Sequence, residues 1–173
     1  MPIVTMVGSR STPVEICEQI TRIAKYLAGR NWILRSGGAD GADSAAERGF
    51  VDCLDRAEIY LPWARFNGNK SILCSPSIEA YKIAATIHPA WSKLPNSVQS
   101  LHARNCHQVL GKKLDTPSDL FICYTENGEL KGGTRTAILL AQNNKVPYFN
   151  LGNIDFSKEK LLETIKSLES TIE

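Results

Sequence analysis

The sequence lacks several features that would place it in a broad class at once. It has no Cys-x-x-Cys pair, and its five cysteines are an odd number, which argues against a disulfide framework and a zinc knuckle. It has no long apolar run, because the opening segment "MPIVTMVGSR" soon reaches a glycine, so we expect neither a signal peptide nor a membrane span. We expect a cytoplasmic protein, of a cell or of an infected host cell, with free buried thiols.

The sequence also lacks a large excess of charge of either sign. The formal net charge of +2 is too small to identify a nucleic-acid binder, although it leaves room for a local basic site. The contents of 43% hydrophobic and 22% charged residues are ordinary for a globular protein. Since no linker, repeat or low-complexity tract interrupts the chain, we expect one domain over residues 1–173, with a carboxyl-terminal helix at about 157–172.

Familiar cofactor and metal motifs are missing. The run Gly37-Gly38-x-x-Gly41 does not have the G-x-G-x-x-G spacing of a dinucleotide-binding turn, and no G-K-[ST] follows it. We therefore expect no cofactor. His102 and His107 are five residues apart, which does not place them on one face of a helix, so we expect no metal site.

What is present is an alternation of short apolar runs and helical patterns. Helical spacing covers residues 12–29, 41–54, 76–88, 97–113, 133–144 and 157–172, and a small hairpin is expected at Asn127-Gly128. Short β-branched runs occupy residues 2–7, 32–36, 57–63, 118–125 and 146–151. This alternation predicts an α/β, Rossmann-like parallel sheet with helices on both faces.

Three of the predicted strands end in glycine-bearing turns before a helix. Glycine lets a ligand approach the backbone, and the open N–H groups of a helix start favour anions. In parallel sheets such ends meet at one edge. Arg104 and Asn105, in "LHARNCHQ", could face the same pocket. The predicted ligand-binding residues are Gly8, Ser9, Arg10, Ser36, Gly37, Gly38, Asp40, Asp43, Arg104, Asn105, Gly132, Gly133, Thr134 and Arg135.

Each of these features also has a purely structural interpretation. Asp40, Asp43 or Thr134 could simply cap a helix, and the glycine turns could be connections. Trp63 and Tyr124 could stack on a base or pack at the rim of the core, and for Trp91 we favour packing.

Together, "GSR", "SGGADGADSAAE", "ARN", and "GGT" followed by "VPYFNL" resemble the SLOG superfamily over about residues 2–150. That group includes DprA/Smf proteins, LOG phosphoribohydrolases and YspA-like proteins, of which the YspA-like branch is most similar. The resemblance implies a Rossmann-like sheet and a nucleotide-derived ligand.

The LOG pattern is only partly present. His102-Ala103-Arg104 matches a His-Glu-Arg segment without its glutamate, and Leu139 stands where the glutamate of P-G-G-x-G-T-x-x-E belongs. N-glycosidic cleavage needs carboxylates, so these absences favour binding without turnover. If the protein is a hydrolase of a nucleotide's N-glycosidic or phosphoester bond, the candidate catalytic residues are Arg104, Asp43 and Glu126, with Asp40 or Glu129 as further carboxylates.

We therefore predict a protein that senses or sequesters a signalling nucleotide, as the superfamily resemblance implies for phage–host conflict. The alternatives are a LOG-like phosphoribohydrolase and a DprA-like protein that binds single-stranded nucleic acid, the latter less favoured. We expect no membrane partner. We also expect a homodimer or higher homo-oligomer, formed through the apolar stripe of the last helix or through "AYKIAATIHPAW".

Overall fold

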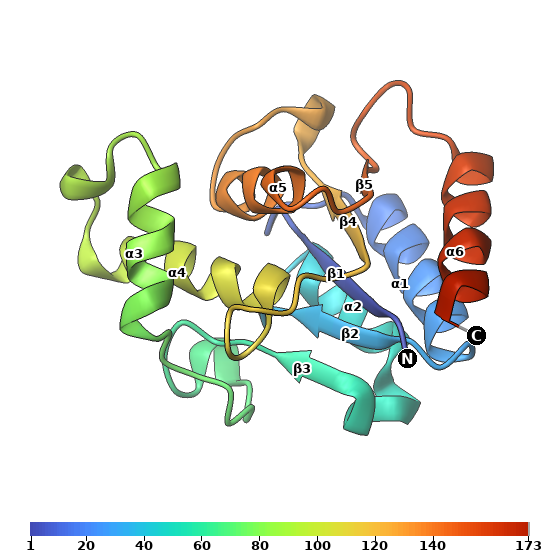
Figure 1. Ribbon diagram of the computed structural model, residues 1–173, viewed down its shortest axis with the longest axis horizontal. Coiled ribbons are helices and arrows are strands. Elements are labelled where there is room, and N and C mark those ends of the chain that lie inside the picture. Colours follow the sequence, from blue (N-terminus) through green and yellow to red (C-terminus); the bar gives the residue numbers. More distant parts are fainter. Residues whose placement is uncertain (173) are drawn as a thin grey trace.

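A five-stranded, all-parallel sheet organises the chain, for which a computed structural model describes residues 1–172 (Figure 1). The strand order is β3-β2-β1-β4-β5. The chain therefore adds β2 and β3 on one side of β1, and then adds β4 and β5 on the other side of β1. The strands are β1 (Ile3–Gly8), β2 (Ile33–Ser36), β3 (Ala57–Ile59), β4 (Leu120–Tyr124) and β5 (Tyr148–Asn150). The predicted α/β Rossmann-like fold is confirmed.

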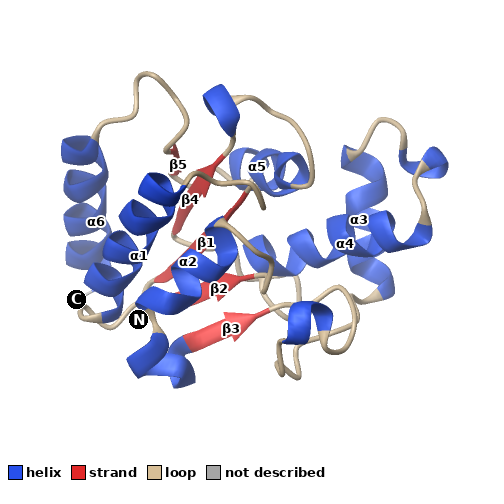
Figure 2. Cartoon of the chain, turned by 180° about the vertical axis from the view of Figure 1, so that it is seen from behind, coloured by secondary structure: helices blue, strands red, loops and turns tan. Residues whose placement is uncertain are grey.

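Helices cover both faces of this sheet (Figure 2). On one face lie α1, α2 and α6, and on the other lie α4 and α5, with α3 packed on α4. The helices are α1 (Val14–Ala28), α2 (Ala42–Gly49), α3 (Ile78–Ile87), α4 (Asn96–Leu110), α5 (Thr134–Asn143) and α6 (Lys158–Ile172). No helix within residues 1–172 combines the length and the apolar character needed to cross a membrane.

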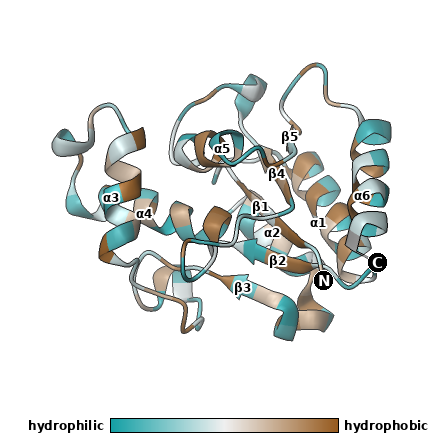
Figure 3. Cartoon of the chain, viewed as in Figure 1, coloured by the Kyte–Doolittle hydropathy of each residue, from teal (hydrophilic) through white to brown (hydrophobic). Residues whose placement is uncertain are grey.

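The sequence of strand β4 is apolar because the strand is buried on both faces of the sheet. Successive side chains of a strand point to opposite faces, so Leu120 and Ile122 enter the core under α1 and α2, while Phe121 and Cys123 enter the core under α4 and α5. All four are at most 1% exposed. Figure 3 shows hydrophobic colouring along this strand and mixed colouring along the helices. A continuous apolar run is thus what a parallel strand buried on both faces requires.

Three predicted elements differ from the structure. The helix expected over 41–54 ends at Gly49, where a Cβ would meet Ala24 of α1 at close range, and irregular 3-10 turns follow over Val51–Arg56. The helix expected to reach 113 ends at Leu110. The hairpin expected at Asn127-Gly128 is wrong, because these residues form a 3-10 turn over Glu126–Gly128, closed by the Gly128 N–H donating to the Thr125 carbonyl at 3.0 Å.

Helix α6 begins close to where the sequence placed it. The Ser157 hydroxyl accepts a hydrogen bond from the Lys160 N–H at 3.2 Å, as expected of a cap. Leu161 and Ile165 are each 1% exposed and pack into the chain's own core. The stripe is therefore largely used inside the chain, and the homo-oligomer stays a prediction that no longer has this stripe to support it.

Candidate functional site

A cleft of about 710 Å³ opens at the carboxyl ends of β1 and β4. This is the place where the strand order changes direction, because the chain leaves β1 toward one face of the sheet and leaves β4 toward the other. Crevices of this kind are where open α/β sheets bind ligands. Its walls come from the turn after β1, the first turn of α5, one side of α4 and the start of α2.

Gly41 brings two of these walls together. Its φ of 76° lies in the left-handed region, and a Cβ there would collide with the backbone of Ser9 and Arg10. Glycine alone satisfies both conditions at low cost. The Ala42 N–H then donates to the Ser9 carbonyl at 3.3 Å, which fixes the start of α2 against the turn after β1.

The first turn of α5 forms the basic side of the cleft. Thr134 and Arg135 begin this ten-residue helix, so its open N–H groups and positive dipole end lie at the cleft. The Asn105 side-chain amide donates to the Gly133 carbonyl at 2.5 Å and holds the turn in place. Nη1 of Arg135 is buried and finds no hydrogen-bond partner among the described residues. Arg10 also lines the cleft.

Asp43 supplies a carboxyl group on the inner wall. It is 3% exposed, and Oδ1 accepts the backbone N–H of Gly8 at 3.2 Å. Burial raises the pKa of Asp43 to about 6, although the nearby charge of Arg104 opposes this rise. One turn further along α2, burial and the charge of Asp43 raise the pKa of Glu47 to about 7.

Arg104 crosses the floor of the cleft and is itself buried, at 6% exposed. Its Nη1 donates to the carbonyls of Gly37 and, at 3.2 Å, of Tyr60, and its Nε donates to the Asn105 amide oxygen at 3.1 Å. Burial lowers the pKa of the guanidinium, and the charge of Asp43 partly offsets this. Two strand ends are thereby tied to α4.

Gly37 lies at the centre of this polar group. A Cβ at that position would collide with Gln108 Nε2 and Arg104 Nη1 and would lie 2.6 Å from Asp43 Oδ2. The three side chains therefore converge on one point. Gln108 is 1% exposed, lines the cleft, and has neither amide atom hydrogen-bonded within the described part of the chain.

Phe66 is an aromatic neighbour of the site. The guanidinium of Arg10 lies 5.8 Å from the centre of its ring and that of Arg104 lies 5.7 Å away. Trp63 packs edge-on against the same ring at 5.2 Å and keeps 40% of its surface exposed. Tyr124 lines the cleft directly, whereas Trp91 packs on Tyr81 as the sequence suggested.

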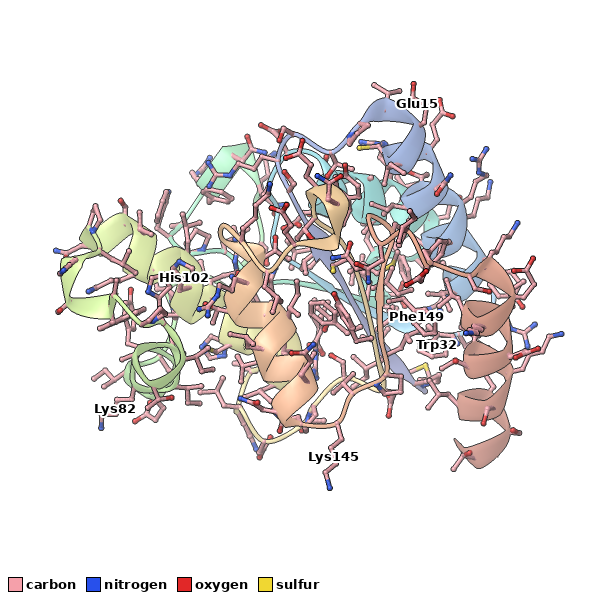
Figure 4. All side chains as sticks on the ribbon, turned by 90° about the horizontal axis from the view of Figure 1, so that it is seen from above. Glu15, Trp32, Lys82, His102, Lys145 and Phe149 are labelled. Atoms are coloured by element: carbon pink, nitrogen blue, oxygen red, sulfur yellow. The ribbon has the colours of Figure 1, made fainter. Side chains whose placement is uncertain are left out.

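The three histidines occupy different environments. His102 lines the cleft, where Nδ1 is 2.8 Å from the Thr136 hydroxyl, and its ring centre is 4.7 Å from that of His88. Figure 4 shows His102 where α4 approaches α5. Burial, with the neighbouring His88, lowers the pKa of His102 to about 4, so the ring is neutral at physiological pH. His107 stacks on Tyr60 away from this group.

The sequence-predicted residues divide into two groups. Ser36, Gly37, Gly38 and Asp40 do not line the cleft: the Ser36 hydroxyl donates to the Met6 carbonyl at 2.7 Å, and Asp40 accepts from Asn67 at 3.0 Å. Those that do line it are Gly8, Ser9, Arg10, Asp43, Arg104, Asn105, Gly132, Gly133, Thr134 and Arg135.

Among the candidate carboxylates, Glu126 lies at an exposed position. Glu126 lines the rim of the cleft and pairs with Lys131 at 2.9 Å, with both side chains largely exposed. Gln108 and His88 were missed, because a glutamine in a helix and a histidine after one have no local signal of burial. The capping interpretation of Asp43 is wrong, since α2 has no side-chain cap.

Neither a family model nor a curated protein matches this sequence. Among solved structures, the chain is similar to DNA processing protein A from Helicobacter pylori, a structure described for its single-stranded DNA binding mode. The identity is 19%, over 99% of this chain and 80% of the other, and the TM-score is 0.57. The chain is also similar to the Moco carrier protein of Chlamydomonas rheinhardtii, at 18% identity over 98% and 85% of the two chains, with a TM-score of 0.49.

The likeness to DNA processing protein A extends over nearly the whole chain. At 19% identity this likeness bears on the fold alone, and it agrees with the Rossmann-like fold predicted from the sequence.

Proposed function

We propose that the protein binds a phosphate-bearing nucleotide, or a molecule derived from one, in the cleft between β1 and β4. This proposal depends on one observation at Arg135. One nitrogen of its guanidinium group is buried beside the start of α5 and has no hydrogen-bond partner within residues 1–172. A buried donor left unpaired is costly, and an anion would satisfy it together with the helix N–H groups. Arg10, which also lines the cleft, adds a second cation.

Binding without turnover is the form of this function that the residues favour. The two positions that carry glutamates in LOG enzymes are Ala103 and Leu139 here, which offer no carboxyl group. Sensing or sequestering a signalling nucleotide fits such a site. The hydrolase alternative is supported by one observation, the cleft-facing Asp43 with its raised pKa beside Arg104.

Calorimetry against AMP, ADP-ribose, a cyclic dinucleotide and ribose 5-phosphate tests the proposal. We expect binding of at least one of them, and we expect Arg135→Gln to weaken it 10- to 100-fold because a charged hydrogen bond is lost. Lys145→Gln is the matched control, since Lys145 points away from the protein body (Figure 4). No binding at millimolar concentration would overturn the proposal.

The same samples separate the alternatives. Free adenine after overnight incubation with AMP would identify the hydrolase, and Asp43→Asn should then abolish its release. If the protein binds an oligonucleotide of thymidines tightly and none of the small ligands, the DprA-like alternative replaces the proposal. Such binding should weaken steeply with salt.

A further inference from the structure

Gln108 is a buried amide that the fold leaves unused. Its backbone carbonyl accepts the Thr5 hydroxyl at 2.5 Å, so this part of α4 is fixed to β1. Its side chain, in contrast, has neither the amide nitrogen nor the amide oxygen hydrogen-bonded, taking residues 1–172 as a whole. Burial of an unpaired amide costs stability, and such groups in folded proteins call for an explanation.

The neighbours of this amide do not supply its partners. Arg104 directs Nη1 to the Gly37 and Tyr60 carbonyls, and Asp43 receives the Gly8 N–H on Oδ1. All three side chains converge beside Gly37, whose lack of a side chain leaves room for them. Gln108 therefore has one acceptor and two N–H donors available on the cleft wall.

Charge gives the cleft two distinct parts. Arg135 and the start of α5 form the part that favours an anion, whereas the positive charge of Arg104 lies beside the Asp43 carboxylate, which offsets it. A nucleotide with its phosphate at α5 would direct its other end toward Asp43 and Gln108. That end carries the base.

We propose that Gln108 recognises the base of the bound nucleotide, by pairing with a nucleobase edge that places a hydrogen-bond donor next to an acceptor. This inference rests on the proposed function. A planar amide presents its N–H and C=O side by side, so two parallel hydrogen bonds fit such an edge, as glutamine does with adenine. The Asp43 carboxylate accepts a further N–H of the same base.

The test compares Gln108→Leu with the unchanged protein, using calorimetry with AMP, GMP, CMP, UMP and ribose 5-phosphate. The nucleotide that the unchanged protein binds most tightly should lose 10- to 100-fold in affinity, since a good bidentate pair discriminates on that scale. Ribose 5-phosphate has no base, so its affinity should stay within twofold. Arg135→Gln should weaken both.

The outcomes separate the two proposals. Equal weakening of nucleotide and ribose 5-phosphate by Gln108→Leu, or no weakening of either, overturns the role of Gln108 and leaves the phosphate site intact. Binding of ribose 5-phosphate with none of the four nucleotides does the same. If nothing binds, the proposed function itself fails.

A second measurement does not depend on ligand. Leucine replaces the unpaired amide with an apolar group of similar size, so Gln108→Leu should unfold at the same or a higher urea concentration. A clear loss of stability would mean that the amide serves the fold, and would overturn a role confined to binding.

Discussion

Asp43 Oδ1 lies 3.2 Å from the backbone nitrogen of Gly8 and accepts its hydrogen bond. This contact joins the first turn of α2 to the last residue of β1. It also keeps a carboxyl group in a place where only 3% of the residue reaches solvent. The protonation state of Asp43 is therefore linked to the stability of the fold.

The first prediction concerns this linkage. The pKa of Asp43 is about 6 in the folded protein and 3.8 in its reference state, so the folded chain binds the proton more tightly. The stabilisation of the folded protein by protonated Asp43 is present at low pH and is lost as the pH rises from about 4 to about 6. Relative to the unchanged protein, Asp43→Asn should gain up to about 3 kcal/mol of unfolding free energy between pH 4 and pH 7.

Urea unfolding at several pH values measures this difference. Since the charge of Asp43 also raises the pKa of Glu47, the asparagine variant should relieve that effect in the same direction. Asp52→Asn, at an exposed position, serves as the control and should show no such trend. A difference that stays flat with pH would contradict the prediction.

The second prediction concerns Gly37. Gly37→Ala places a methyl group among Arg104, Gln108 and the Asp43 carboxylate, so it should destabilise the fold by about 1–3 kcal/mol and remove ligand binding. Gly133→Ala is the comparison for stability, because its φ of −64° suits alanine and the space around it is open. Its stability should change by less than about 0.5 kcal/mol. Equal effects of the two variants in urea unfolding would count against the packing seen at Gly37.

The third prediction concerns the attachment of α6. Glu169 accepts the indole N–H of the fully buried Trp32 at 2.8 Å and also pairs with Arg30, whose side chain is 43% exposed. Glu169→Ala leaves the indole unpaired and should cost about 1–3 kcal/mol. Arg30→Ala leaves the indole N–H paired with Glu169 and should cost less than Glu169→Ala. Denaturation followed by tryptophan fluorescence orders the two variants, and the reverse order would refute the assignment.

The fourth prediction concerns thiol reactivity. Burial raises the pKa of Cys106 to about 12 and that of Cys123 further above its usual range. Neither should be alkylated by iodoacetamide in the folded protein, while the half-buried Cys17, Cys53 and Cys74 should react first. Peptide mass spectrometry identifies the sites, and labelling in urea should reach all five. Early labelling of Cys123 would contradict its burial.

The fold was largely predictable because its signals are local. Apolar runs such as that of β4 and helical spacing such as that of α1 can be counted along the chain, and their alternation allows few topologies. Boundaries were less predictable. At Gly49, where α2 ends, a side chain would clash with Ala24 of α1, and a contact between two segments leaves no signal in the sequence of either one.

The site was predictable only where glycine marks it. The turns at Gly8 and Gly133 could be found because they interrupt a pattern. The floor of the cleft could not be predicted, because residues far apart in the sequence form it. Arg104 and Gly37, for example, are 67 residues apart. Gln108 has no sequence signal, since what distinguishes it is a side-chain amide without a hydrogen-bond partner among residues 1–172.

The shortness of β3 and β5 bears on how copies of this chain can meet. Each outer strand has only three residues, and Pro147, which has no N–H, directly precedes β5. Short edge strands offer few unpaired backbone groups to a strand of a neighbouring molecule. They therefore resist edge-to-edge pairing of sheets and fibre formation. If copies of the chain associate, we expect them to join through helical surfaces, with each five-stranded sheet kept separate.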